Sequence, residues 1–263
     1  MKKILFYILF FTTVCLAQTM PSVDTGNIQQ AVSSSGGTSG TISSFVVPSG
    51  TNKCILVGVA IRGDQYVTGI TFNTSENFVK VDSDKYSTGT GSLTIELWKL
   101  VNPTSTTANI VVTYNANLTF TSGIGAVSLT DVDQTTTIGA SYKPGLQVTT
   151  TPSANITTTT ANSLVMDFLA IRQTSATFTS DYTTVFGGGA GVAAIAGGSQ
   201  SAATATTYTM SGTVSGTYVI MTIVVEVLGS SAGASGWSGI INGVTPTSIN
   251  GKAVSGISKV IGK

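Results

Sequence analysis

Short apolar runs divided by Gly, Ser, Thr, Asn and Pro recur along most of the chain. The run "KCILVGVAI" (53–61) is apolar on both faces of a strand, whereas in "LTIELWKL" (93–100) Leu93, Ile95 and Leu97 alternate with other residues. No apolar pattern of helical period lasts beyond two turns. Thr and Val favour strands, and Gly and Ser supply turns. The chain therefore predicts an all-β protein.

Strand-like runs follow one another at short intervals from residue 43 onward. Regularly spaced short strands are typical of two packed antiparallel sheets, so we expect an antiparallel β-sandwich, jelly-roll-like, over residues 43–229. One sandwich is favoured over two small domains because no linker divides this span, the Gly- and Ala-rich stretch 187–207 being the one candidate break. The predicted strands are 43–47, 54–61, 67–72, 78–81, 93–100, 108–114, 123–129, 147–151, 154–160, 164–171, 192–198, 207–210 and 218–228.

Residues 1–17 have the parts of a secretory signal peptide. Lys2 and Lys3 form a basic start, the apolar run 4–14 is too short to cross a bilayer, and small residues precede Gln18. We therefore expect export, cleavage before Gln18, and no membrane span in the mature chain.

Two alternatives to a cleaved signal stay open. One is a lipoprotein signal with an acylated Cys15, which Thr12-Thr13-Val14 matches poorly. The other is a retained membrane anchor. The ending "LAQ" resembles signal peptides of Bacteroidetes, which implies a periplasmic, secreted or cell-surface protein. The polar, Gly- and Ser-rich residues 18–42 are expected to form a flexible leader.

The C-terminal part divides into a Gly/Ser linker, 230–236, and a small apolar repeat, 237–263. Three Ile residues recur every eight positions, and Asn-Gly follows two of them. This pattern favours short β-arcs with Asn-Gly turns, and one chain alone offers too little apolar area to stabilise them. We expect the repeat to form a homo-oligomer, a trimer, or to dock to another structural protein. Removal of residues 230–263 should convert the oligomer to a monomer. The alternative is a disordered tail. The assembly residues would be Trp237, Ile241, Ile249 and Ile257.

Composition argues against several classes of function. Charged residues are 9% of the 263, against about 25% in an ordinary soluble domain, and the net charge of +1 gives no case for nucleic acid. The chain has no His, the commonest general base. Cys54, in an apolar run, is expected to be a buried hydrophobe. A secreted glycoside hydrolase would need two linked carboxylates, and its candidates are Glu96, Asp167 and Glu226.

Two kinds of binding site are candidates. Exposed aromatic faces serve sugar-binding sandwiches, although Trp98 has core packing as its alternative. Calcium is the one cofactor considered, on paired acids such as Asp82 and Asp84 or, preferably, Asp131 and Asp133, with turn capping as the alternative. An Arg62-Gly63-Asp64 tripeptide is expected to be an ordinary turn. The aromatic candidates are Trp98, Tyr66, Tyr86, Tyr142 and Tyr182.

Several motifs resemble a recurrent β-sandwich domain of phage structural proteins and secreted bacterial surface proteins. Glu96, Trp98 and Pro103 match its "E-hydrophobic-W" strand before a Pro, and "TDVDQTT" (130–136) matches its "GVDQTTP" element with Thr137 where Pro is frequent. The C-terminal segment resembles "INGV" repeats near the ends of phage virion and fibre-like proteins. These resemblances imply a display or binding module without a general reaction.

Three functions follow from these observations. The first is a non-enzymatic exported surface protein, a display or adhesion module that could bind glycans and is assembled or anchored through its C-terminal repeat. The second is a phage virion structural protein, such as a head fibre, decoration or tail-associated protein. The third, a secreted hydrolase, is disfavoured by the missing His and the unlinked carboxylates.

Overall fold

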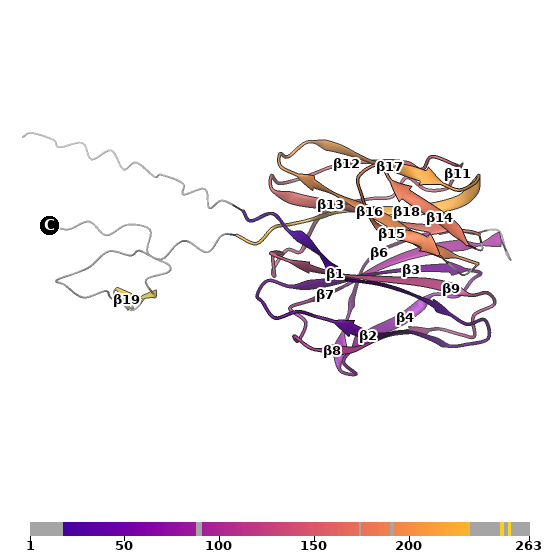
Figure 1. Cartoon of the computed structure of the whole chain (residues 1–263), viewed down its shortest axis with the longest axis horizontal. Coiled ribbons are helices and arrows are strands. Elements are labelled where there is room, and N and C mark those ends of the chain that lie inside the picture. The colour runs from indigo at the N-terminus through magenta and orange to yellow at the C-terminus, as the bar shows by residue number, and fades with distance from the viewer. Residues whose placement is uncertain are drawn as a thin grey trace, which may run out of the picture. The chain divides into compact units, whose positions relative to one another are not determined.

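The computed structural model describes residues 18–87, 91–173, 175–189 and 192–231, and the backbone of 248–249 and 252–253. Thr19–Ser230 form one compact unit, and the remaining residues at both ends form another. The compact unit is all-β with antiparallel sheets, as predicted, and it is layered (Figure 1). In the described part of the chain, no helix is long and apolar enough to cross a membrane.

The first half of the compact unit is a sandwich of two sheets. A five-stranded sheet has the order β1-β9-β3-β7-β6, and a four-stranded sheet has the order β2-β8-β4-β5. Phe45, Phe72 and Trp98 lie in the apolar core between them. The strands are β1 (Ser22–Ser33), β2 (Ser39–Val46), β3 (Cys54–Arg62), β4 (Val67–Phe72), β5 (Glu76–Asn77), β6 (Val79–Tyr86), β7 (Leu93–Val101), β8 (Thr107–Tyr114) and β9 (Ser122–Thr130).

The second half is one nine-stranded sheet that curls over its own core. Its order is β10-β18-β13-β16-β15-β14-β17-β12, with β11 paired to β18. Short ladders from β14 to β15 and from β14 to β17 join its two layers, so the sheet nearly closes into a barrel. The strands are β10 (Ile138–Tyr142), β11 (Gln147–Thr149), β12 (Ser153–Thr157), β13 (Ser163–Ile171), β14 (Ala176–Ser180), β15 (Thr183–Gly189), β16 (Ala194–Ala202), β17 (Thr207–Val214) and β18 (Tyr218–Val227).

The two halves repeat one topology, which corrects the single sandwich expected over 43–229. The orders β9-β3-β7-β6 and β2-β8-β4 of the first half recur as β18-β13-β16-β15 and β12-β17-β14 in the second. The strands β8 and β17 even share the same alternation of buried and exposed positions. No linker composition marks the junction because residues 131–137 are hydrogen-bonded into both halves: Val132 N donates to Asn52 O and Asp133 N to Leu228 O, both at 2.9 Å.

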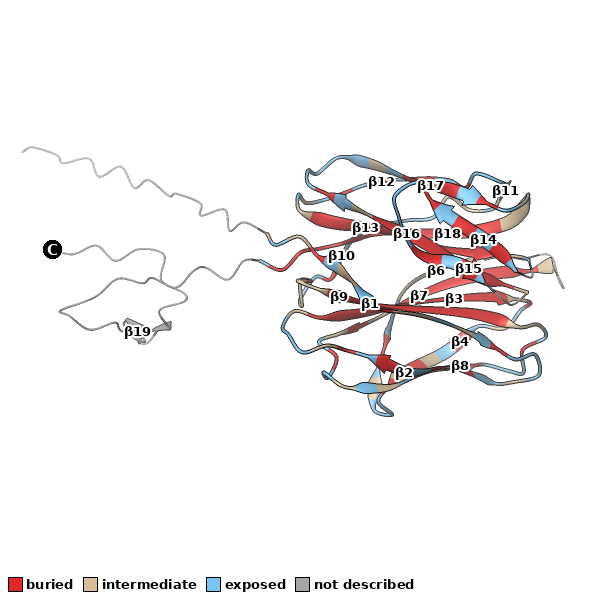
Figure 2. Ribbon diagram, viewed as in Figure 1, coloured by how far each residue is buried: buried red, intermediate tan, exposed pale blue. Residues whose placement is uncertain are grey.

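The central strands of the five-stranded sheet, β3, β7 and β9, are buried on both faces (Figure 2). One face packs on the four-stranded sheet, and the other packs on the second half. On that second face, glycines leave room for large side chains. A Cβ at Gly58 would lie 2.8 Å from Phe168 Cδ1, and a Cβ at Gly125 would lie 3.0 Å from Phe186 Cε1. The close fit of these rings over the glycines joins the two sandwiches into one core.

The expected flexible leader, 18–42, is also corrected. It forms all of β1, which pairs with β9, and the first part of β2, which pairs with β8. The segment is polar because β1 lies at the edge of its sheet with only one paired side, and many of its side chains are exposed. Pairing with the neighbouring strand satisfies the hydrogen-bonding groups of the backbone, so a polar segment can form a strand here.

Several predicted features lie outside the described residues. These are the signal peptide 1–17, the linker beyond Ser231, and the side chains of the repeat, including Trp237, Ile241, Ile249 and Ile257. Within the repeat, the backbone of β19 (Ser248–Ile249) pairs with that of β20 (Lys252–Ala253) across positions 250 and 251. Those two positions are the second Asn-Gly of the sequence and lie outside the described residues.

The packing over Gly58 generates a stability prediction. Gly58→Ala should lower the free energy of unfolding by about 1–3 kcal/mol, because its methyl group would press on Phe168. Adding Phe168→Leu should recover part of that loss. Gly69→Ala is the matched control, since nothing lies within 4 Å of its added Cβ. Equal stability of the Gly58 and Gly69 variants in denaturant titrations would contradict the packing account.

Candidate functional site

The five aromatic residues proposed to bind sugar do not form one platform. Trp98 is only 7% exposed and belongs to the core of the first sandwich, so its alternative, core packing, is confirmed. Tyr86 is half-buried against the core between the halves. Tyr66, Tyr142 and Tyr182 are exposed, but they lie in the β3–β4 loop, in β10 and in the β14–β15 loop. No ring–ring contact joins any two of these five residues.

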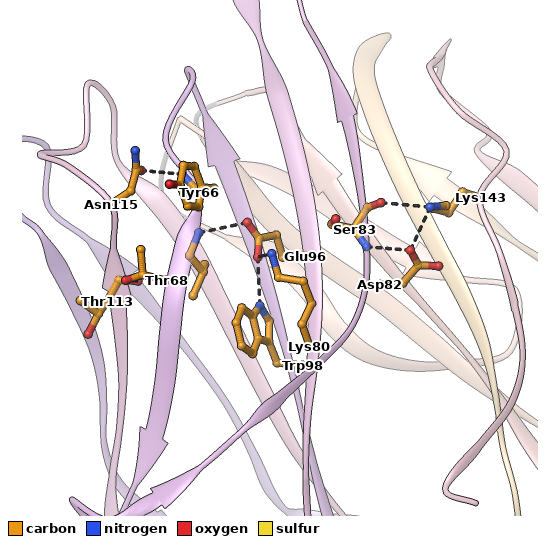
Figure 3. A network of polar contacts seen from close by, with 11 residues as sticks. Tyr66, Thr68, Lys80, Asp82, Ser83, Glu96, Trp98, Thr113, Asn115 and Lys143 are labelled. Atoms are coloured by element: carbon orange, nitrogen blue, oxygen red, sulfur yellow. Dashed lines mark hydrogen bonds and ion pairs between the residues drawn. The ribbon is translucent and has the colours of Figure 1, made fainter.

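Glu96 and Trp98, the core of the "ELW" motif, form a buried polar clamp (Figure 3). Glu96 is 1% exposed; its Oε1 accepts from Val67 N at 3.0 Å, and its Oε2 accepts from Trp98 Nε1 at 3.1 Å. Lys80 Nζ is 2.6 Å from Oε2 and lies 5.0 Å from the centre of the Trp98 ring. The carboxylate thus joins β4, β6 and β7, and a buried charge of this kind needs such partners. Its role here is structural.

The other two candidate carboxylates also lie inside the protein. Glu226 is fully buried and accepts from Thr159 N at 2.8 Å, from Thr160 N at 3.0 Å and from Ala140 N at 3.1 Å. Burial alone would raise the pKa of Glu226, but the bonds from Thr159 and Thr160 outweigh burial and lower it. Asp167, 3% exposed, accepts from Gly198 N, and burial raises its pKa to about 6. Neither side chain lines a described cleft.

The preferred calcium pair has backbone-directed roles. Asp133 Oδ1 accepts from Thr135 N at 2.7 Å and from Thr136 N at 2.8 Å, which is the turn-capping alternative. Asp131 has a φ of 59°, and its carbonyl oxygen accepts from Ser230 N at 2.7 Å. Among the described residues, no three His, Cys, Asp or Glu side chains come together as a metal site.

Other acidic candidates are paired within the protein. Burial acts to raise the pKa of Asp82, but Lys143 Nζ at 2.9 Å, Ser141 Oγ at 2.7 Å and Ser83 N outweigh it, so the pKa falls. This ion pair links β6 to the segment after β10. In the Arg62-Gly63-Asp64 turn, Asp64 accepts from Lys85 and Ser92. The Arg62 guanidinium lies 4.2 Å from the centre of the Phe120 ring, so both ends of the tripeptide have partners.

A cleft of about 340 Å³ lies between the two sandwiches. One side is the beginning of β1, and the other is formed by β15 and β16. The cleft joins residues 20–23 and 25 to residues 164, 183 and 199–201, which lie far apart in the sequence. The one local signal is the placement of Ser199 and Ser201 in a strand whose earlier part is almost entirely Ala, Ile and Gly.

Comparison with known proteins does not assign the chain to a family. No protein-family model, curated protein or solved structure matches the chain. The resemblance of the "ELW" and "TDVDQTT" motifs to a β-sandwich family is therefore supported only at the level of an all-β, antiparallel protein. In this chain, both motifs have structural roles: the first clamps one sandwich, and the second joins the two halves.

The buried Asp167 predicts a pH dependence of stability. Its folded-state pKa of about 6 exceeds the unfolded value of about 3.9, so its contribution to stability is full below pH 4 and is lost as the pH rises through 6. The difference in free energy of unfolding between wild type and Asp167→Asn should change by on the order of 1–3 kcal/mol between pH 4 and 7. Asn retains an acceptor for Gly198 N without titrating. A pH-independent difference in urea titrations would contradict this assignment.

Proposed function

We propose that the protein is a non-enzymatic exported surface protein, a rigid display or adhesion module held through its C-terminal repeat. The observation that carries this proposal is that both ends of the compact unit leave it together. Thr19 N donates to Ser230 O at 2.8 Å, and Gln18 pairs with Ser231. A module tethered at that end presents its opposite end to the surroundings.

The opposite end consists of loops from both sandwiches. The register of β1 on β9 runs from Ser22 opposite Thr130, near the chain ends, to Ser33 opposite Ser122. At this second end, loop 63–66 connects β3 to β4, and loop 115–121 connects β8 to β9 (Figure 1). Arg172 from the second sandwich donates to Gly91 O at 2.7 Å in the same region, which ties the two sets of loops together. Such an end suits contact with another surface.

The sheet edges favour assembly through the C-terminal repeat. Register breaks interrupt β1, β2, β6 and β10, and β6 also carries Lys80, Asp82, Asp84 and Lys85. Breaks and charges of this kind discourage strand addition from another chain. The expected trimer would therefore depend on the repeat. A truncation that tests this should begin after Ser231, since Ser230 belongs to the compact unit.

A phage virion structural protein is the second candidate. The resemblance of the repeat to virion and fibre-like proteins favours it. The signal peptide favours the exported surface protein, because capsid parts assemble in the cytoplasm. The two candidates therefore differ in whether the chain crosses a membrane.

Thiol labelling tests export directly. Asn117→Cys places a thiol on an exposed loop, whereas Cys54 is fully buried and its pKa is raised to about 12 by burial. We expect a membrane-impermeant maleimide to label Asn117→Cys on intact bacteria or in the medium. Wild type should stay unlabelled until denatured, and the mature chain should begin at Gln18. Labelling only after lysis, with Met1 intact, would reject export and favour the virion candidate.

A further inference from the structure

We propose that the cleft between β1 and β15–β16 binds an uncharged sugar residue. The inference deepens the proposed adhesion role by assigning it a ligand class and a site. It rests on the module being presented outside the cell, which the labelling experiment tests separately.

The cleft is built by an irregularity in β1. Val23 pairs with Leu129 and Ile28 with Val127, so residues 24–27 of β1 oppose Ser128 alone. This bulge is held by Asp24, whose carboxylate accepts from Gly26 N at 3.2 Å and from Asn27 Nδ2 at 2.6 Å. Large bulges redirect side chains and often lie beside binding sites. Here the bulge contributes Thr25 to the wall of the cleft.

A hydroxyl without a protein partner faces the cleft. Ser199 is 4% exposed, lines the cleft, and makes no side-chain hydrogen bond to any described residue. The Ser199 oxygen is not among the fully buried unpartnered atoms of the described residues, so water or a ligand can reach it. Some other unpartnered hydroxyls, such as those of Ser128 and Thr222, are sealed in the core and cannot reach a ligand. Ser199 differs from them because it opens onto the cleft.

Two further hydroxyls share the face of Ser199. Thr183 is paired with Ser199 across the ladder, and Ser201 follows it two positions along β16. Their side chains therefore project on one side, about 4.8 Å apart between strands and about 6.8 Å apart along β16. All three line the cleft. A row of neutral donors and acceptors at these separations can bond several hydroxyls of one ring.

The rest of the lining selects the ligand class. Apolar side chains of Met20, Val23 and Leu164 complement the C–H face of a pyranose, and the lining contains no charged residue. Phosphates, carboxylates and nucleotides would find no counter-charge there. The volume of about 340 Å³ falls at the lower end of small-ligand sites, about 300–1,000 Å³. A single neutral sugar residue, at the end of a glycan, therefore fits the cleft best.

Ligand-observed NMR on the mature full chain tests the site. The probes are methyl glycosides of glucose, galactose and mannose, with glucuronic acid and glucose 6-phosphate as charged comparisons. We expect at least one neutral glycoside to bind with Kd on the order of 1 mM and the charged sugars to bind more weakly. Ser199→Ala and Thr183→Val should each weaken binding by about twofold to tenfold, and Ser201→Phe should abolish it by filling the cleft.

Thr213→Val is the matched control, because Thr213 is an exposed threonine on β17 that does not line the cleft. It should bind like wild type, and thermal unfolding of every variant should confirm that the module is folded. Binding that survives Ser201→Phe would place the site elsewhere and overturn the inference. No binding of any neutral glycoside would also overturn it, leaving water as the occupant of the cleft. Neither result would alter the labelling outcome that tests export.

Discussion

Burial of the central strands β3, β7 and β9 on both faces of the five-stranded sheet is the constraint on which the rest of the structure depends. Apart from their last residues, strands β3 and β9 are apolar or small throughout, with Gly58 and Gly125 where Phe168 and Phe186 approach. A sheet with two buried faces needs a cover on each side, which the four-stranded sheet and the second sandwich supply. Charged groups buried near this core require partners. For the Glu96 carboxylate, these partners are Val67 N, Trp98 Nε1 and Lys80 Nζ.

Much of the strand pattern could be predicted from local sequence, because period and turn residues act over a few positions. The apolar strands expected at 54–61, 93–100 and 164–171 coincide with β3, β7 and β13. The repeat of the sandwich could not be predicted, since the two halves share strand order and burial but little sequence, and Glu96 of β7 has no acidic counterpart in β16. The edge strand β1 was missed because its stability comes from pairing with β9.

Of the candidate site, the sequence could predict only that charged side chains would be scarce. A chain with 9% charged residues and no His offers few charged side chains for any site, and the lining of the cleft contains none. Its position depends on the bulge of β1 and on contact between the two sandwiches, neither of which leaves a local signal. The aromatic residues were the wrong guide for Trp98, because the same indole that could stack on a sugar completes the core and donates to Glu96.

Hydrogen exchange on the mature chain tests most directly whether the doubly buried sheet unites the two sandwiches. Amides of β3 and β9 in the first sandwich, and of β13 and β18 in the second, should exchange only by global unfolding and give one common opening free energy. That value should equal the free energy of unfolding measured in denaturant. Two distinct opening free energies, one for each sandwich, would contradict the single shared core and the rigid module built on it.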